Sequence, residues 1–521
     1  MDADVIVVGA GPTGLLLAVE LRRAGVDVLV LEQHPRIREV AKAGGLNGQV
    51  LDLLELRGDL PRFEAASTAP RPTPHFPWGG MHVDLSRLPG PPMSALPLPQ
   101  PRLEALLDDF ARELGAEVRR SHQVVDLSQD EDGVDVEVRG PQGLDRLRAA
   151  YVVGCDGASS RVRELLRVEF PGRTYPEVHR LASTTMPASV RVVDGGDLEV
   201  DGVGRIRFGF TRTEHGELAV GSADPEVLGV FTSEPDSGAY DDDQPMTVEE
   251  MRASVRRVLG VDLPMGEPLR LTRFTFHARE VERYREGRVL LAGDAAHLFP
   301  APGAALNVDL LDAVNLAWKL GAEVAGWASP GLLDSYHDER RVAVGRTMLH
   351  TQAQVALRRG HDPAAQALRE LVGELLLDER PLRRIGSLMA GSDVRYPFPG
   401  QERHPLVGRF LPRLVPDEDP GADDRGTLRV GARPVLLLLA DRPEVRDAAR
   451  EWRHRVDART LSVRDRPADA LLVRPDAHVA WAAGVDERAD TGALREALAH
   501  WCGAPGPETR ASASAQAERN G

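Results

Sequence analysis

The chain has few cysteines, few aromatic residues and no long apolar run. Its two cysteines, Cys155 and Cys502, form neither a CxxC motif nor a metal-ligand spacing. We therefore expect no disulfide framework, no dithiol redox site and no metal centre. No apolar stretch approaches the ~20 residues that span a bilayer, and no basic leader precedes the first apolar run. We expect a cytoplasmic protein without a membrane segment or signal peptide.

The charge balance is acidic, with 64 basic and 80 acidic side chains and a net charge of −16. Such a surface disfavours nonspecific binding to nucleic acid or anionic membranes, so a small-molecule substrate is expected. With 521 residues, of which 42% are hydrophobic, the chain is too long for one compact core. Two or three domains are expected, in a monomer or a homodimer.

The most specific motif lies near the N-terminus, where residues 5–32 read VIVVGAGPTGLLLAVELRRAGVDVLVLE. An apolar run, a glycine turn, a helical segment and a second apolar run predict a βαβ unit. Gly9 allows the tight turn, Gly11 lets the backbone approach a pyrophosphate, and Gly14 lets the helix lie close to the strand. The helix N-terminus then offers free N–H groups to phosphates. This predicts a dinucleotide site.

The second apolar run ends on Glu32, where a carboxylate can accept hydrogen bonds from ribose hydroxyls. The same negative charge argues against a 2′-phosphate at this position. At this point of the argument NAD and FAD both remain open.

Two later motifs each follow a predicted strand. GCDGASSRVR, residues 154–163, places the Asp156-Gly157 turn before a short helix, with Ser160 as a capping residue. RVLLAGDAAHLFPAPGAALN, residues 288–307, places Asp294 at the carboxyl end of a strand, where ligands bind in α/β sheets. A carboxylate at this position can bind ribose or ribityl hydroxyls.

The rest of the chain divides by pattern. We predict a dinucleotide-binding, Rossmann-like domain from residues 1–180 and 286–395, and an inserted antiparallel β-sheet substrate domain over about 181–285. Residues 405–503 follow the β-α-β-β-α order of a thioredoxin-like domain, although they lack CxxC. The small polar residues of 504–521 predict a disordered tail.

Hydrophobic periodicity predicts three helices that bear on this division. They cover Val248–Leu259 in the substrate domain, Leu310–Val324 after the third motif, and residues 445–456 in the C-terminal region.

The three motifs together resemble those of the class A flavoprotein aromatic hydroxylases, which share the fold of para-hydroxybenzoate hydroxylase. The segment DAVNLAWKL (312–320) belongs to the same family pattern. The segments AAYVVGCDGASSRVR (149–163), LLDSYHDERR (332–341) and ALLVRPDAHVAWAAG (470–484) are closest to the branch that tailors aromatic polyketides, including angucyclines. The resemblance covers roughly residues 1–500. It implies FAD as the cofactor, NAD(P)H as a transient reductant, and no second nucleotide domain.

The resemblance also implies roles for individual residues. FAD contacts are expected from Gly9, Gly11, Pro12, Thr13, Gly14, Glu32, Gln33, Lys42, Gln100, Arg102, Asp156, Gly293, Asp294, Pro300, Gly303, Leu306 and Asn307. The loop beside the flavin ring is expected to comprise Pro300, Ala301, Pro302, Gly303, Ala304, Ala305 and Leu306. Candidate substrate contacts are Arg205, Arg207, Phe208, Phe210 and Phe299. His297 is expected to be structural, and no metal ligand is expected.

The implied reaction is hydroxylation of a polycyclic aromatic polyketide with O₂ through a flavin C4a-hydroperoxide. The chain departs from the family where PxGGQGMN is replaced by Pro302–Asn307, and where arginines are replaced by Lys42 and Gln49. These departures keep three alternatives open: a Baeyer–Villiger oxygenase, a flavin-retaining non-redox enzyme such as a polyketide dehydratase, and a non-catalytic scaffold.

Overall fold

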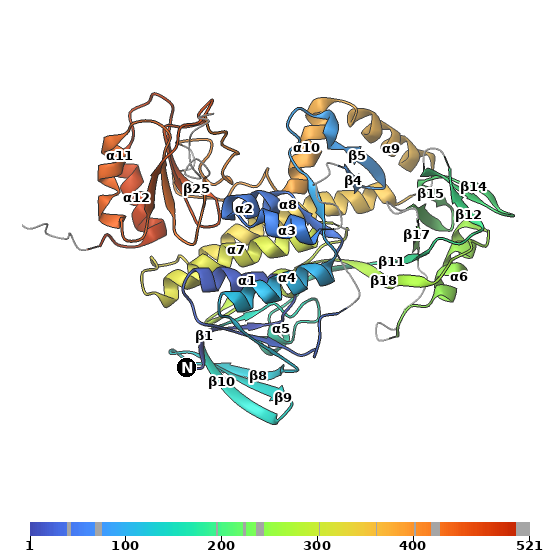
Figure 1. Cartoon of the computed structure of the whole chain (residues 1–521), viewed down its shortest axis with the longest axis horizontal. Helices are drawn as coiled ribbons and strands as arrows, with labels where there is room; N and C mark the ends of the chain where they lie inside the picture. Colours follow the sequence, from blue (N-terminus) through green and yellow to red (C-terminus); the bar gives the residue numbers. More distant parts are fainter. Residues whose placement is uncertain are drawn as a thin grey trace, which may run out of the picture.

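The computed structural model describes most of the chain and places three units in a row (Figure 1). The described residues are 1–38, 43–67, 75–193, 196–221, 226–235, 244–301, 303–360, 362–400, 403–417 and 428–506. Lys42, Pro302 and most of the predicted tail at 504–521 lie outside these ranges. None of the helices in the described ranges combines the length and apolar character needed to cross a bilayer.

A mixed eight-stranded sheet forms the centre of the molecule. Its main path runs β19-β20-β10-β1-β2-β7, and β8 and β9 extend it beyond β10. The neighbours from β20 to β7 pair in parallel, as expected for strands connected by helices. The strands are β1 (Ala3–Val8), β2 (Val28–Glu32), β7 (Glu117–Arg120), β8 (Gln123–Gln129), β9 (Val134–Gly140), β10 (Gly143–Gly154), β19 (Arg285–Glu286) and β20 (Val289–Leu291).

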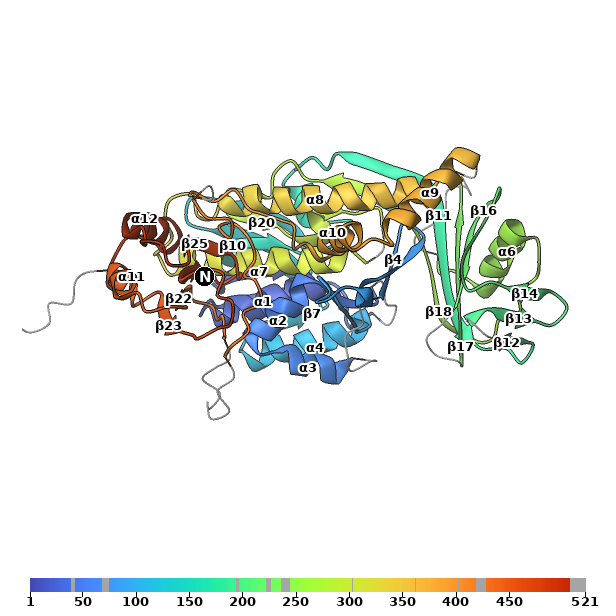
Figure 2. The ribbon, with the colours of Figure 1, turned by 90° about the horizontal axis from the view of Figure 1, so that it is seen from above.

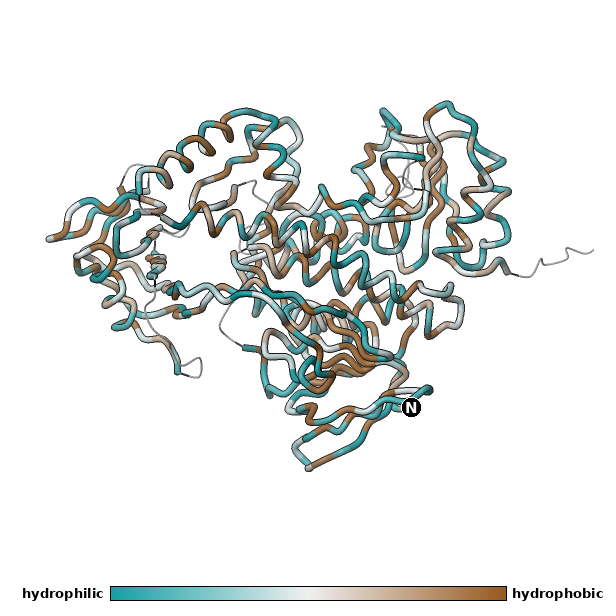
Figure 3. The backbone as a smooth tube through the Cα atoms, turned by 180° about the vertical axis from the view of Figure 1, so that it is seen from behind, coloured by the Kyte–Doolittle hydropathy of each residue, from teal (hydrophilic) through white to brown (hydrophobic). Residues whose placement is uncertain are grey.

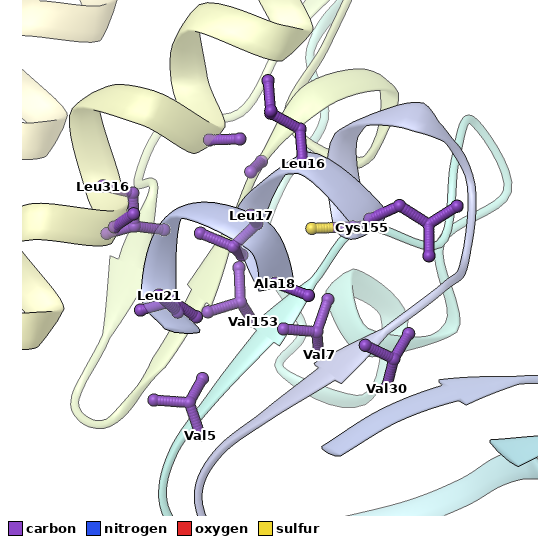
Figure 4. Close-up of a cluster of buried hydrophobic side chains, with 14 of the residues drawn as sticks. Val5, Val7, Leu16, Leu17, Ala18, Leu21, Val30, Val153, Cys155 and Leu316 are labelled. Atoms are coloured by element: carbon purple, nitrogen blue, oxygen red, sulfur yellow. The ribbon is translucent and has the colours of Figure 1, made fainter. Parts of the chain in front are cut away.

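Helix α1 (Pro12–Arg23) lies on this sheet and is itself covered by α7 (Ala305–Val324) and α4 (Gln100–Glu113). Ten consecutive residues of α1 are buried, which explains why most of them are apolar. The charged exception, Glu20, is paired with Arg23 and Arg57. Figure 4 shows Val5, Val7 and Val153 of the sheet beneath Leu17 of α1, with Leu316 of the neighbouring helix. Figure 3 shows the same concentration of apolar residues in the parallel strands.

An antiparallel six-stranded sheet forms one end of the molecule (Figure 2). Its order is β15-β16-β17-β11-β18-β21, and α6 (Val248–Leu259) packs on one of its faces. The strands are β11 (Gly172–Thr185), β15 (Gly209–Thr213), β16 (Gly216–Val220), β17 (Val227–Glu234), β18 (Pro268–Glu280) and β21 (His297–Leu298), with a separate sheet of β12 (Val190–Val192), β13 (Leu198–Val200) and β14 (Gly204–Ile206).

The C-terminal unit forms the other end. Its sheet order is β23-β22-β24-β25, with β22 parallel to β23 and antiparallel to β24. With α11 and α12 the order along the chain is β-α-β-β-β-α, one strand more than the predicted β-α-β-β-α. The strand that the sequence pattern missed is β23, which is mostly exposed and carries no apolar run. Its elements are β22 (Val435–Leu438), α11 (Pro443–Ala448), β23 (Asp457–Thr460), β24 (Ala470–Val473), β25 (Val479–Ala483) and α12 (Thr491–Cys502).

The remaining helices and hairpins connect these units. Helix α8 runs from the central sheet to the six-stranded sheet, and α9 and α10 follow it (Figure 2). These elements are β3 (Gly45–Asn47), α2 (Gln49–Arg57), α3 (Leu60–Ala66), β4 (His75–Trp78), β5 (Met81–Asp84), β6 (Ala95–Pro97), α5 (Arg161–Leu165), α8 (Ser335–Arg358), α9 (Pro363–Leu375) and α10 (Glu379–Ala390).

The predicted fold class is confirmed, and the predicted helix at Val248–Leu259 has the observed bounds. Two helices differ from the sequence expectation. Helix α7 begins at Ala305 rather than Leu310, because the polar residues Asn307 and Asp309 interrupt the apolar pattern although they are buried. The predicted helix over 445–456 is shorter and continues as a 3-10 turn. The domain boundaries themselves stay a prediction.

Candidate cofactor and substrate site

In the N-terminal glycine turn, backbone segments lie so close together that two of the glycines have no space for a side chain. Gly9 has a φ of 106°, and a Cβ there would lie 2.4 Å from the Cys155 carbonyl oxygen. A Cβ on Gly14 would lie 2.0 Å from the carbonyl oxygen of Gly9. A Cβ on Gly11 would meet no protein atom of the described structure within 4 Å. Gly9 and Gly14 are therefore required by packing, whereas Gly11 faces open space that a ligand can occupy.

Two helix N-termini meet at this turn. Helix α1 begins at Pro12 and α7 begins at Ala305, and neither first turn receives a side-chain cap from the residues that the structure describes. A Cβ on Gly293, in the Gly-Asp motif, would lie 2.9 Å from the Thr13 hydroxyl, so this motif packs directly on the first turn of α1. Uncapped N–H groups at a helix N-terminus favour an anion such as a pyrophosphate.

Glu32 lies beside the same turn. Its Oε2 accepts a hydrogen bond from the Ala10 N–H at 2.9 Å, and its Oε1 accepts one from the His34 N–H at 2.8 Å. These bonds orient the carboxylate, and each oxygen keeps a second lone pair for a ribose hydroxyl. The next residue, Gln33, is exposed.

Behind the Gly-Asp motif lies a buried cluster of charged groups. Asp312 accepts hydrogen bonds from Arg340 Nε at 2.5 Å, from His297 Nε2 at 2.7 Å and from the Gly293 N–H at 2.9 Å. Burial raises the pKa of Asp312, but Arg340 and His297 outweigh it and hold the pKa below its usual value. His297 is fully buried and its Nε2 is hydrogen-bonded to Asp312, and its structural role stays a prediction.

Asp309 connects this cluster to Asp294. It is buried, and its carboxyl is hydrogen-bonded to that of Asp294. Burial, with the charges of Asp294 and Asp312, raises the pKa of Asp309 well above its usual value. A protonated Asp309 donates a hydrogen bond and holds Asp294, which is only half-buried, at the carboxyl end of its strand.

The loop before α7 is held by a residue that the sequence motifs did not reveal. The Asn307 side-chain oxygen accepts a hydrogen bond from the Asn47 N–H at 2.7 Å. The Asn47 side chain donates to the Gly303 carbonyl at 3.1 Å. Pro300 and Ala301 are buried, Gly303 is exposed, and Ala304, Ala305 and Leu306 are half-buried. The segment around Asn47 has no motif of its own, and its pairing with β6 and its contacts with α7 place it here.

The remaining residues predicted to contact the cofactor lie in different surroundings. Gln100 begins α4 and accepts a hydrogen bond from the Ala43 N–H at 3.1 Å, next to the strand that carries Asn47. Arg102 is exposed, and its side chain makes no hydrogen bond or ion pair with the described part of the chain. The carboxylate of Asp156 accepts from Ser160 at 2.5 Å and from the Val162 N–H at 3.0 Å, so it caps α5.

The five candidate substrate residues do not gather in one place. Arg205 lies on β14 and forms an ion pair with Asp197 at 2.7 Å, and Arg207 and Phe208 follow it, both exposed. Phe210 lies in the six-stranded sheet, where its ring contacts that of Phe231 edge-on at 6.4 Å. Phe299 is buried beside His297, with ring centroids 5.0 Å apart. Phe210 and Phe299 thus lie in different surroundings, Arg205 belongs to a separate sheet, and Arg207 and Phe208 lie in the segment between β14 and β15.

The chain's own geometry fits a dinucleotide: an open cradle at Gly11, two uncapped helix N-termini and two carboxylates placed for hydroxyl groups. Comparison with known families decides which dinucleotide it is. The sequence profile of the FAD-binding domain matches residues 2–351, and that of the aromatic-ring hydroxylase C-terminal domain matches residues 404–505. The chain belongs to the FAD-binding aromatic-ring hydroxylases. It is an FAD-dependent enzyme of the monooxygenase type.

Characterised relatives match nearly the whole chain. A 12-dehydrotetracycline 5-monooxygenase/anhydrotetracycline 6-monooxygenase of Streptomyces rimosus is 40% identical, over 97% of this chain and 100% of its own. The solved structure of CabE, an aromatic hydroxylase from angucycline biosynthesis, is 37% identical over 97% of this chain and 100% of its own, with a TM-score of 0.83. A dialkyldecalin synthase of Streptomyces rugosporus is 36% identical over 96% of this chain and 99% of its own.

Proposed function

We propose that the enzyme hydroxylates a polycyclic aromatic polyketide, using NAD(P)H as reductant and O₂ as the oxygen source. The support for the substrate class is the similarity, over nearly the full chain, to hydroxylases of tetracycline and angucycline biosynthesis. The aromatic residues of the six-stranded sheet, among them Phe210 and Phe231, suit a flat apolar substrate.

The cofactor contacts are proposed from the geometry. The N–H groups at the start of α1 would bind the pyrophosphate above Gly11, and Glu32 would bind the adenosine ribose. Asp294, held by Asp309, would bind the ribityl chain. The Asn47–Gly303 and Asn47–Asn307 hydrogen bonds would fix the loop beside the flavin ring.

FAD supplies the electron-transfer and oxygen-activating chemistry. The chain holds the reacting partners together and excludes water from them. Pro300 and Ala301 are buried and Ala304 and Ala305 are half-buried, and their apolar side chains would lie beside the flavin ring. These groups would keep that side of the ring dry.

The test is substrate-dependent consumption of NADPH and O₂ by the FAD-loaded enzyme, with a panel of polycyclic phenols. We expect equal molar consumption of both and a hydroxylated product for at least one phenol. A product that forms anaerobically and without NADPH would contradict the proposal and identify a non-redox enzyme.

A further inference from the structure

One face of the six-stranded sheet carries a cluster of aromatic side chains that no helix buries completely. Strand alternation directs Arg180 and Ala182 of β11 to the α6 side, where Arg180 pairs with Glu250 at 2.9 Å. His179 and Leu181 point to the opposite face. On that face Phe210, Phe231 and Phe274 are half-buried and come from β15, β17 and β18. We call these three phenylalanines, together with Phe276, the aromatic face.

His179 stands among these rings. Its ring centroid lies 4.0 Å from that of Phe276, 5.3 Å from Phe274 and 5.8 Å from Phe231. The residue is only 4% exposed, and both ring nitrogens lack a hydrogen-bond partner within the described chain. A buried polar group without a partner destabilises the folded state, so such groups in native proteins call for a partner.

The surroundings of His179 keep its imidazole neutral. Burial lowers its pKa well below the usual value, and the positive charges of Arg358 and Arg359 lower it further. A neutral imidazole has one donor nitrogen and one acceptor nitrogen, which matches a phenol hydroxyl or a quinone carbonyl rather than a carboxylate.

The end of α8 reaches this face (Figure 2). The Arg358 guanidinium lies 5.3 Å from the Phe231 ring centroid and 5.7 Å from that of Phe210, and pairs with Glu217 at 2.9 Å. Glu217 also pairs with Arg212 at 2.9 Å. A flat ligand would either stack between the Arg358 guanidinium and these rings or displace the guanidinium from them. If Arg358 is displaced, Glu217 still has Arg212 as its partner.

We propose that His179 is the hydrogen-bonding residue by which the aromatic face recognises an oxygen substituent, a phenol hydroxyl in the first place, on a polycyclic aromatic substrate. The rings provide apolar contact that any flat polycycle satisfies. The imidazole selects and orients the hydroxylated one, because a substrate without a hydroxyl has no donor for the acceptor nitrogen and would leave it unpaired. This inference rests on the proposed function.

The test is binding rather than turnover. Equilibrium dialysis measures the affinity of the FAD-loaded enzyme for emodin, a trihydroxyanthraquinone, and for its fully O-methylated ether. We expect the wild type to prefer emodin by about tenfold or more, and His179→Phe to lose this preference while binding the ether as well as the wild type does. The melting temperature of His179→Phe should equal or exceed that of the wild type, because the substitution removes two unpaired nitrogens.

Three further variants make the outcome specific. His179→Asn and His179→Gln each restore one donor and one acceptor, and at least one of them should recover the preference for emodin. His215→Phe changes a histidine on the exposed turn after β15, with a side chain 65% exposed, and should leave the preference unchanged.

Persistence of the preference in His179→Phe would overturn the inference and leave the proposed function standing. So would equal wild-type affinity for emodin and its ether, or failure of both amide variants to recover the preference. Absence of any polycyclic aromatic binding by the wild type would instead contradict the proposed substrate class, and this inference with it.

Discussion

The cofactor side and the aromatic face are built by opposite means. On the cofactor side, backbone contacts around Gly9 and Gly14 leave no space for a side chain, and buried charges such as Asp312 have their partners. On the aromatic face, half-buried rings surround a histidine whose nitrogens have no partner among the described residues. The cofactor side is positioned mainly by contacts within the chain, although His297 Nδ1 and Asp309 Oδ1 have no hydrogen-bond partner among the described residues. The aromatic face instead leaves both nitrogens of one imidazole for a ligand. A cofactor common to a family permits the first arrangement, and a substrate that differs between relatives favours the second.

The largest expected effect is the loss of FAD binding when the glycine turn on the cofactor side is disrupted. Gly14→Ala places a methyl group against the Gly9 carbonyl, so α1 must move away from the turn. We expect the purified variant to lose FAD and to have a lower melting temperature even as the apoprotein, as measured by flavin absorbance and thermal unfolding.

Gly11→Ala is the matched control, because its methyl group meets no protein atom of the described structure. The apoprotein should melt as the wild type does, while FAD affinity falls by about tenfold or more. Equal FAD affinity in Gly11→Ala and the wild type would show that the pyrophosphate does not lie above this residue.

The second largest effect concerns the buried charges behind the Gly-Asp motif. Asp312→Asn leaves the Arg340 guanidinium buried without its counter-charge, which costs about 3–5 kcal/mol of the free energy of unfolding. Arg341→Met, one residue further along α8, removes an exposed side chain 3.9 Å from Glu280 and should cost less than about 1 kcal/mol. If urea unfolding showed a similar loss in the free energy of unfolding for both variants, the buried Asp312–Arg340 pair would matter no more than an exposed charge, which would contradict this account.

Acid should lower the free energy of unfolding of the protein through His350, which lies on α8, the helix that joins the two regions. Burial lowers the pKa of His350 on α8 from 6.5 to about 4. Between these values the unfolded chain binds a proton that the folded protein does not, so stability falls as pH falls from 6.5 towards about 4. We expect His350 to account for about 2 kcal/mol of the loss at pH 5.

In His350→Met this contribution to the pH dependence of unfolding should disappear. An unchanged difference between the free energies of unfolding at neutral pH and at pH 5 would show that the buried imidazole accepts its proton without cost.

The smallest expected effect concerns the hydrogen bond between Asn47 and the loop at Gly303, and it tests whether Asn47 belongs to the cofactor side. Asn47→Ala removes the side-chain hydrogen bond to Gly303 but keeps the backbone bond to Asn307. Loss of one neutral hydrogen bond is worth about 1 kcal/mol, so FAD affinity should fall by about fivefold with little change in apoprotein stability. Wild-type affinity in this variant would remove Asn47 from the cofactor site.

The residues that sequence could identify are those fixed by the backbone. Gly9, Gly14 and Asp294 stand in motifs because one tight turn and one strand end require them. Asn47 reaches the site from a segment without a motif, through strand pairing that spacing does not encode. Arg340 stands in the LLDSYHDERR segment, but the sequence does not show that helix packing brings it to Asp312. His179 was missed because the face to which a β residue points depends on where the strand and its partner helix lie.

The central claim is that this chain uses FAD and O₂ to hydroxylate a polycyclic phenol. The most direct measurement is mass spectrometry of the product formed by the FAD-loaded enzyme with NADPH under ¹⁸O₂. The account predicts one ¹⁸O atom in a new ring hydroxyl, and none when the gas is ordinary O₂ and the water is labelled. A product without the label, or one that forms without O₂, would contradict it.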